Sequence, residues 1–231
     1  MSGRGAPRPP GRIGPLLGRP IGQFLTFVYW HTIVRGGKRI PRKGPVVIIA
    51  NHVGFIDGPV AVGAIPRASH FMVKKDMFRG PLALILRGTG QIQVEGDGRR
   101  ALGRARAVLQ RGGIIGVFPE GTRGAGDAAS LAGGAAWLAL HGGAPVVPLA
   151  LLGTRLAGES VNVWPRPRRR MILEFGEPIT LEIPEGVKGT ARQQFAENAV
   201  AEALRTHVQR VVSENDIPLP MDDHLRKSAQ S

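Results

Sequence analysis

One histidine and one aspartate stand at a spacing that can support proton transfer. The segment 51–57 reads Asn-His-Val-Gly-Phe-Ile-Asp, which places His52 and Asp57 five positions apart. A histidine whose ring is held by a carboxylate can take a proton from a hydroxyl group at neutral pH. The chain has no cysteine, so a thiolate nucleophile is excluded. The spacing therefore predicts acid–base chemistry carried out by His52.

The apolar run before this segment predicts the element that positions His52. Residues 45–50 read Pro-Val-Val-Ile-Ile-Ala, a short run rich in β-branched residues, which is typical of a buried strand. We therefore expect His52 to emerge from the end of a core strand, where side chains reach a cleft. Asp57 precedes Gly58-Pro59 and an apolar stretch, so its second expected role is to cap a helix, which is worth ~1 kcal/mol of stability.

Beyond this segment, short apolar runs alternate with helix-like stretches. The expected strands are 46–50, 69–73, 91–94, 114–118, 146–151, 160–164 and 171–175. The expected helices are 58–64, 76–87, 98–111, 131–141 and 190–213. This alternation predicts a single α/β domain built around a mixed, mostly parallel sheet that is flanked by helices.

Four blocks, in this order, resemble the family of 1-acylglycerol-3-phosphate acyltransferases. The Asn-His-x4-Asp block is followed by a lysine-containing block at 71–78, by Phe-Pro-Glu-Gly-Thr-Arg at 118–123, and by a proline-containing strand at 144–150. The resemblance implies an O-acyltransferase with His52 and Asp57 as catalytic residues. The substrate-binding residues that it implies are Asn51, Lys74, Glu120, Gly121, Thr122 and Arg123.

The family's reaction moves a fatty acyl group from an acyl thioester to the hydroxyl of a lysophospholipid. The resemblance implies lysophosphatidic acid as the default acceptor, phosphatidic acid as the product, and His52 as the general base, with its ring held by Asp57. Arg123 suits a phosphate because a planar guanidinium can bind two oxygens at once, and Lys74 is the second expected phosphate partner. Backbone amides near Gly54 or Gly121 are candidate donors to the oxyanion. The implied donor is acyl-CoA or an acyl carrier protein, with no bound cofactor or metal ion.

One position departs from the family pattern and leaves the acceptor open. In the block at 90–96, Gly96 stands where the family has an arginine, and Arg99 or Arg100 could reach the same place from the next helix. Another lipid or glycolipid alcohol is therefore an alternative acceptor. A hydrolase that uses water as acceptor, and a non-catalytic lipid-binding protein, are the two alternative classes. These residues do not distinguish the donor, the acyl length or the oligomeric state.

The charge of the chain favours anionic partners. The formal net charge is +14, which suits lipid phosphates, coenzyme A or an acidic carrier protein, although a GC-rich genome would also explain many surface arginines. Aromatic residues make up only 5% of the chain and no nucleic-acid module is recognised, so we expect no nucleic-acid partner. Neither Gly-x-Ser-x-Gly nor a P-loop occurs, which argues against serine hydrolases and P-loop nucleotide enzymes.

Composition along the chain predicts four regions. We expect a disordered basic tail over 1–20, an amphipathic interfacial helix over 21–36, the acyltransferase domain over 37–215, and a flexible tail over 216–231. No apolar stretch reaches the ~20 residues that a membrane-spanning helix needs. The segment 21–36 is aromatic, partly polar and flanked by basic residues, which favours a helix in the head-group layer over an ordinary core helix. The expected location is peripheral, on the cytoplasmic face of the cell membrane.

Overall fold

The structure is a computed structural model that describes residues 9–119 and 128–220, with side chains described over 9–119 and 133–220. Within these residues, seven strands form one sheet in the order β1-β7-β6-β2-β5-β3-β4. The strands are β1 (His31–Arg35), β2 (Val46–Ala50), β3 (Ser69–Lys74), β4 (Ile92–Val94), β5 (Ile114–Val117), β6 (Val146–Leu152) and β7 (Arg170–Phe175). Neighbouring strands from β6 to β4 are parallel, whereas β7 is antiparallel to β6 and parallel to β1. The predicted mixed, mostly parallel sheet is confirmed.

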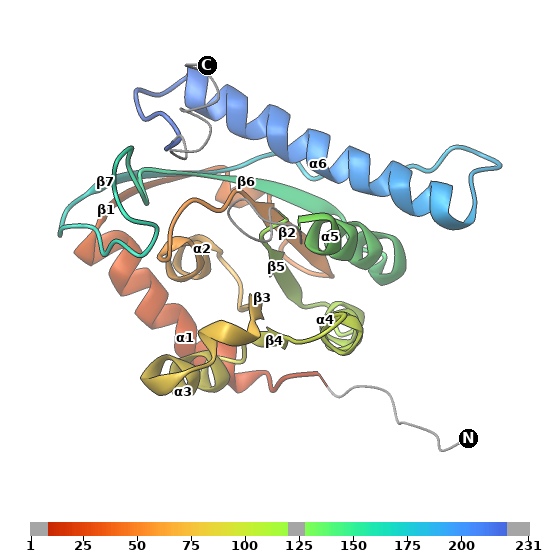
Figure 1. Ribbon diagram of the computed structural model, residues 1–231, viewed down its shortest axis with the longest axis horizontal. Helices are drawn as coiled ribbons and strands as arrows, with labels where there is room; N and C mark the ends of the chain where they lie inside the picture. Colours follow the sequence, from red (N-terminus) through yellow and green to blue (C-terminus); the bar gives the residue numbers. More distant parts are fainter. Residues whose placement is uncertain (1–8, 120–127, 221–231) are drawn as a thin grey trace, which may run out of the picture.

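Helices cover both faces of the sheet (Figure 1). They are α1 (Ile13–Gln23), α2 (Asp57–Ala64), α3 (Gly80–Gly88), α4 (Arg99–Gln110), α5 (Ala128–Gly142) and α6 (Gly189–Ser213), with a π-helix η1 (Phe24–Tyr29) and short 3-10 turns η2 (Gly37–Arg39) and η3 (Lys75–Met77). Helices α4, α5 and α6 pack on one face, and α2 and the end of the N-terminal helix pack on the other. The five predicted helices are all present, with boundaries that shift by a few residues.

The central strand β2 has the predicted bounds, 46–50, and is buried on both faces. Val47 and Ile49 pack toward α4, α5 and α6, while Val46 and Ile48 pack toward α2 and Trp30. Because successive strand side chains point to opposite faces, a strand between two helical layers must be apolar at every position. This explains the uninterrupted apolar run in the sequence, and it places the residue that follows β2 at the carboxyl edge of the sheet.

The N-terminal segment differs from the prediction. Helix α1 begins at Ile13, so the expectation of a disordered tail is wrong for residues 13–20, and the expected helix over 21–36 ends at Tyr29. Strand β1 then occupies 31–35, where β-branched residues pair in parallel with β7. Glycines within α1 do not end the helix but allow other elements to pack closely against it. A Cβ on Gly22 would come within 2.8 Å of the backbone nitrogen of Gly63 in α2.

Two other predictions are corrected. The expected strand at 160–164 is a turn in the loop between β6 and β7, closed by the Val163 N–H donating to the Ser160 carbonyl at 3.0 Å. The expected flexible tail is wrong for residues 216–220, because Ile217 is buried and Leu219 packs on the core beneath α6.

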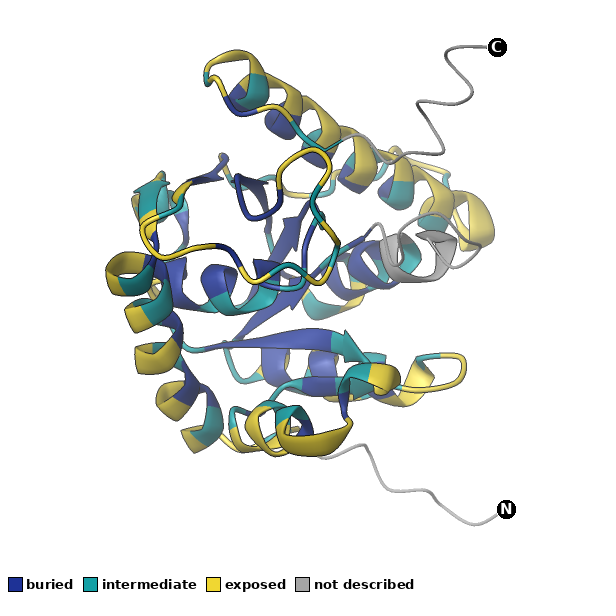
Figure 2. Cartoon of the chain, turned by 60° about the vertical axis from the view of Figure 1, so that its left-hand side comes forward, coloured by how far each residue is buried: buried dark blue, intermediate teal, exposed yellow. Residues whose placement is uncertain are grey.

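Figure 2 shows the buried sheet enclosed by helices whose exposed residues lie on their outer sides. Over the two described ranges, no helix is both long and apolar enough to cross a membrane.

Candidate active site

His52 and Asp57 form a direct pair at the carboxyl edge of β2. The Nδ1 atom of His52 lies 2.8 Å from Oδ2 of Asp57. The side chain of His52 is 26% exposed, whereas that of Asp57 is fully buried. Because a carboxylate accepts the Nδ1–H, the lone pair of the neutral ring lies on Nε2. In this arrangement Nε2 of the half-buried ring can act as a base, while Nδ1 contacts the buried carboxylate of Asp57.

The turn between His52 and α2 wraps around the carboxylate of Asp57. Oδ2 accepts hydrogen bonds from the backbone N–H of Val53 at 2.7 Å and of Gly54 at 2.8 Å, in addition to the imidazole. Asp57 is the first residue of α2 and makes no capping bond to the helix, so the expected N-cap role is wrong. The N–H of Gly54 is used by Asp57, which also removes it as an oxyanion donor. Three donors on one oxygen fix the orientation of the carboxylate.

Phe118 fixes the plane of the imidazole. Its ring stacks on His52 with centroids 4.5 Å apart and planes at 25°. Phe118 follows β5, the neighbour of β2, and its ring also lies 5.4 Å from Phe71 of β3. The sequence analysis used this residue only as part of a motif and assigned it no role. The sequence signal that could have indicated a role for Phe118 was its position directly after a core strand that lies parallel to β2.

Asn51 joins the end of β2 to β6. Its side chain is 2% exposed, its Nδ2 donates to the carbonyl of Leu151 at 2.9 Å, and its Oδ1 accepts from the N–H of Leu151 at 2.7 Å. Both polar groups of the amide are therefore bound to backbone. The resemblance implied a substrate-binding role for Asn51. Because its amide is occupied by backbone, we infer that it positions the neighbouring His52.

Lysine and arginine side chains around the same edge differ in their partners. Lys74 ends β3 and is half-buried, and its side chain makes no hydrogen bond or ion pair with another described residue. It stands two strands from β2, roughly 10 Å across the sheet. Lys75 is 66% exposed and lies 3.8 Å from Glu95. Arg99 is 88% exposed and pairs with Asp97, and Arg100 is exposed, so neither is placed at the site by a described contact.

The remaining predicted residues, Glu120, Gly121, Thr122 and Arg123, lie outside the described part of the chain. The loop from 153 to 169 contributes a residue that the sequence analysis missed. Arg155 is 6% exposed and packs against Gly54. A Cβ added to Gly54 would lie 3.3 Å from the Cβ of Arg155. The signal for it was a charged residue just after β6, because the ends of parallel strands meet at one edge of a sheet.

Hydrogen bonds connect the same loop to the turn after β2, and further bonds hold the loop together. The N–H of Phe55 donates to the carbonyl of Val161 at 2.9 Å. Glu159 accepts two hydrogen bonds from Arg169, and this pairing holds the pKa of the Glu159 carboxyl below its ordinary value. Trp30 anchors the far end of the loop, where its Nε1 donates to the carbonyl of Pro165 at 3.2 Å. The loop thus links the N-terminal layer to the turn that carries His52.

Comparisons with known proteins bear on the family and the fold of this chain. Residues 31–152 match the family model described as Acyltransferase. A 1-acyl-sn-glycerol-3-phosphate acyltransferase from Bacillus subtilis is 31% identical over 156 residues, which cover 63% of this chain and 75% of that protein. One from Borreliella burgdorferi is 30% identical over 128 residues, 53% of this chain and 51% of that protein.

A solved structure has the same fold. It is that of the 1-acyl-sn-glycerophosphate (LPA) acyltransferase from Thermotoga maritima, with a TM-score of 0.63 and 22% sequence identity. The match covers 85% of this chain and 79% of that chain. The likeness supports the arrangement of the sheet and its helices.

Replacing Asn51 by leucine tests its positioning role. The variant leaves the N–H and carbonyl of Leu151 unpaired in the interior, so we expect the free energy of unfolding to fall by about 1–3 kcal/mol. Chemical denaturation measures this change. Asn162→Leu, at an exposed position of the loop, is the control and should change stability by less than about 0.5 kcal/mol. Equal stabilities of the two variants would refute the role.

Proposed function

This chain belongs to the acyltransferase family, and we propose that it transfers a fatty acyl group from an acyl thioester to the hydroxyl of lysophosphatidic acid, giving phosphatidic acid. The observation that supports the proposal most is the contact of 2.8 Å between His52 and Asp57 at the carboxyl edge of the sheet. Two relatives that carry this activity in their names are about 30% identical to the chain. The chain is an O-acyltransferase, and the acceptor, donor and residue roles are the parts proposed here.

In the proposed reaction His52 is the general base. Its Nε2 removes the proton of the acceptor hydroxyl while the oxygen attacks the thioester carbonyl. The carbon–sulfur bond then breaks, and the proton passes from the imidazolium to the departing thiolate. Asp57 keeps the proton of the neutral ring on Nδ1 and stabilises the imidazolium that forms. Base assistance of this kind contributes roughly 10²- to 10⁴-fold to the rate.

The phosphate of the acceptor is proposed to meet Lys74 and Arg123. Support for Lys74 comes from its place at the same edge as His52 and from the absence of any hydrogen bond or ion pair to another described side chain. A fixed phosphate would hold the acceptor's hydroxyl near the imidazole, so that binding energy is used for orientation. Gly96 stands at the position where the family has an arginine. It is exposed in the turn after β4, and a Cβ added there would meet no atom within 4 Å.

The donor is proposed to be acyl-CoA or an acyl carrier protein. Both are anionic, and the chain has a formal net charge of +14, which favours their approach. The thioester carbonyl is already electrophilic, so the reaction requires no covalent enzyme intermediate. The residues described at the site therefore need only bind, orient and move one proton.

The N-terminal helix is proposed to lie on the cytoplasmic face of the cell membrane. Its exposed apolar side chains recur every three or four positions and form one stripe along α1 and η1: Ile13, Leu16, Leu17, Ile21, Phe24, Phe27 and Val28. Leu84 of the adjacent helix α3 adds to it, with 72% of its surface exposed. Figure 2 shows this outer side of the N-terminal layer exposed. An apolar stripe of this size at the surface suits the boundary between head groups and acyl chains.

His52→Ala tests the reaction. We expect thiol release from acyl-CoA, measured with lysophosphatidic acid present, to fall at least 100-fold because no base remains at the hydroxyl. Near wild-type turnover in the variant would contradict the proposed mechanism.

A comparison of acceptors tests phosphate recognition. A monoacylglycerol, which lacks the phosphate, should be a poor acceptor for the wild-type protein, and equal use of both acceptors would contradict phosphate recognition. Thiol release without a new ester would indicate a hydrolase.

Phe24→Glu tests the membrane surface. The side chain is 54% exposed on the apolar stripe, so a charge there should weaken binding to anionic vesicles about tenfold in a sedimentation assay. Phe195→Glu is the matched control, because Phe195 is 40% exposed on α6, away from the N-terminal layer. Equal vesicle binding by both variants would show that the stripe is not the docking surface.

A further inference from the structure

A cavity opens at the edge of the sheet opposite to His52. It has a volume of about 280 Å³ and is lined by the residues that precede β3 and β5, the end of α4 and the start of α1. Strands β3 and β5 run from this edge toward the catalytic edge. Since each strand residue advances the chain by about 3.3 Å, the two edges are separated by roughly 15 Å. The cavity is therefore not part of the site described above.

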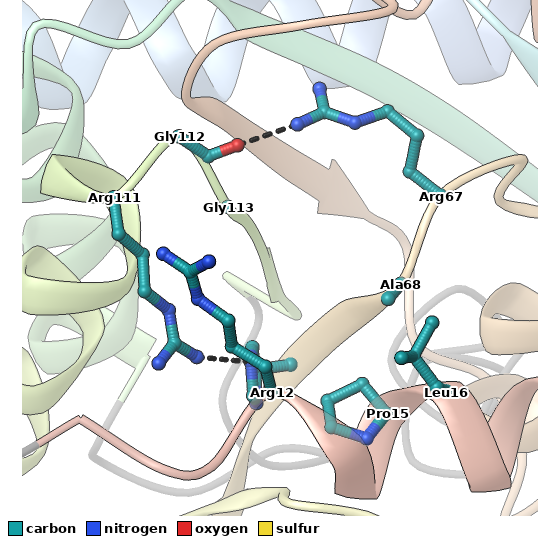
Figure 3. A pocket seen from close by; sticks show the side chains of 9 residues that line it. Arg12, Pro15, Leu16, Arg67, Ala68, Arg111, Gly112 and Gly113 are labelled. Atoms are coloured by element: carbon teal, nitrogen blue, oxygen red, sulfur yellow. Dashed lines mark hydrogen bonds between the residues drawn. The ribbon is translucent and has the colours of Figure 1, made fainter.

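Three arginines surround this cavity, and no acidic residue lines it within the described chain. Figure 3 shows the side chains of Arg12 and Arg111 lying next to one another, while Arg67 reaches away from them toward Gly112. Arg12 comes from the residue before α1, Arg67 from the residues before β3, and Arg111 from the end of α4. Three elements that are far apart in sequence thus bring three positive charges to one hollow.

The hydrogen bonds of the three guanidinium groups differ. Arg67 is bound to backbone, donating to the carbonyls of Pro41 at 2.7 Å, Gly44 at 2.9 Å and Gly112 at 2.5 Å. Arg111 uses one N–H, at 3.0 Å from Nε2 of His70. The side chain of Arg12 makes no hydrogen bond or ion pair with another described residue, so none of its five N–H donors is used within the described chain. Arg67 therefore supplies a fixed charge, and Arg12 and Arg111 supply unused donors.

His70 fixes the direction of Arg111. The carbonyl of Gly90 can only accept, so Nδ1 of His70 carries the proton and donates to it at 2.7 Å. Nε2 is then the acceptor for Arg111. Burial lowers the pKa of His70, which keeps this ring neutral, and burial together with the charge of Arg12 lowers the pKa of Arg111. The two guanidinium groups repel one another at a place where an anion would relieve the repulsion.

The start of α1 adds to the positive potential. The helix has 11 residues, its N-cap position is Arg12, and no side chain caps its first turn. Pro15 and Leu16 of that turn line the cavity. Although Pro15 has no N–H to offer, an uncapped helix start carries a partial positive charge that adds to the charge of the arginines. Together with the arginines, it makes a site with donors and charge for an anion of more than one negative charge.

We propose that this cavity binds a phosphate group, as a second anion site separate from the acceptor site near His52. The forked guanidinium groups of Arg12 and Arg111 match phosphate oxygens, and the three charges favour a dianion over a carboxylate. The bound phosphate ties the start of α1 to the end of α4. Because Leu16 is also part of the exposed apolar stripe, the phosphate can come from a lipid head group as well as from solution.

The test removes the two arginines that have unused donors. In Arg12→Gln/Arg111→Gln, inorganic phosphate measured by calorimetry should bind the full chain at least tenfold more weakly than in the wild type. Arg67 is kept because its three backbone bonds make it part of the fold. The control, Arg104→Gln/Arg192→Gln, removes two exposed charges elsewhere and should change binding less than twofold. Acetate, with one negative charge, should bind the wild type more weakly than phosphate.

A second arm distinguishes the source of the phosphate. Vesicles that contain phosphatidic acid are compared with vesicles of phosphatidylcholine alone for the same variants. Loss of phosphate binding in solution without loss on the anionic vesicles identifies a free phosphate compound, and loss in both arms identifies a lipid head group. Equal binding of inorganic phosphate by the wild type and the double variant, or equal loss in the control, would overturn the proposal. His52→Ala should bind as the wild type does, so the result does not depend on acyl transfer.

Discussion

The site depends on the buried carboxylate oxygen of Asp57 and its three hydrogen bonds. The imidazole of His52 and the N–H groups of Val53 and Gly54 all approach Oδ2, which makes the turn after β2 a shell around one negative charge. Without that charge, nothing described at the site would hold the imidazole proton on Nδ1. With it, the ring has one orientation, and Phe118 holds its plane by stacking. In the proposed mechanism, the basic atom is thus prepared before any substrate arrives, which is how an enzyme avoids reorganisation during the reaction.

The rest of the fold holds this turn at the edge of the sheet. Strand β2 lies between β5 and β6, and residues at or just after the ends of these strands contact the turn or its base: Phe118 after β5, Asn51 after β2, Leu151 near the end of β6, and Arg155 after β6. The cavity at the opposite edge has a different character, because three arginines and no described carboxylate line it. The sheet therefore separates the His52–Asp57 pair from a cationic cavity, while one N-terminal helix carries apolar side chains on its outer side.

Local sequence predicted the elements whose signal is local. The apolar run at 46–50, the strands and helices that alternate after it, and the family of the chain could all be inferred from runs and spacings. Other features depend on contacts between distant residues. Residues 31–35 form a strand because they pair with β7, and the side-chain amide of Asn51 is hydrogen-bonded because Leu151, near the end of β6, lies beside it. Arg12, Arg67 and Arg111 lie 44 to 99 positions apart, so no motif could reveal their cavity.

The measurement that tests the central claim most directly is the turnover of Asp57→Asn. An amide can still accept the two backbone bonds, so the turn should remain folded, but it cannot supply the negative charge that stabilises an imidazolium. We predict that kcat for acyl transfer to lysophosphatidic acid falls at least 100-fold, with KM changed less than threefold and an unchanged circular dichroism spectrum. A folded variant that keeps the kcat of the wild type would contradict the account.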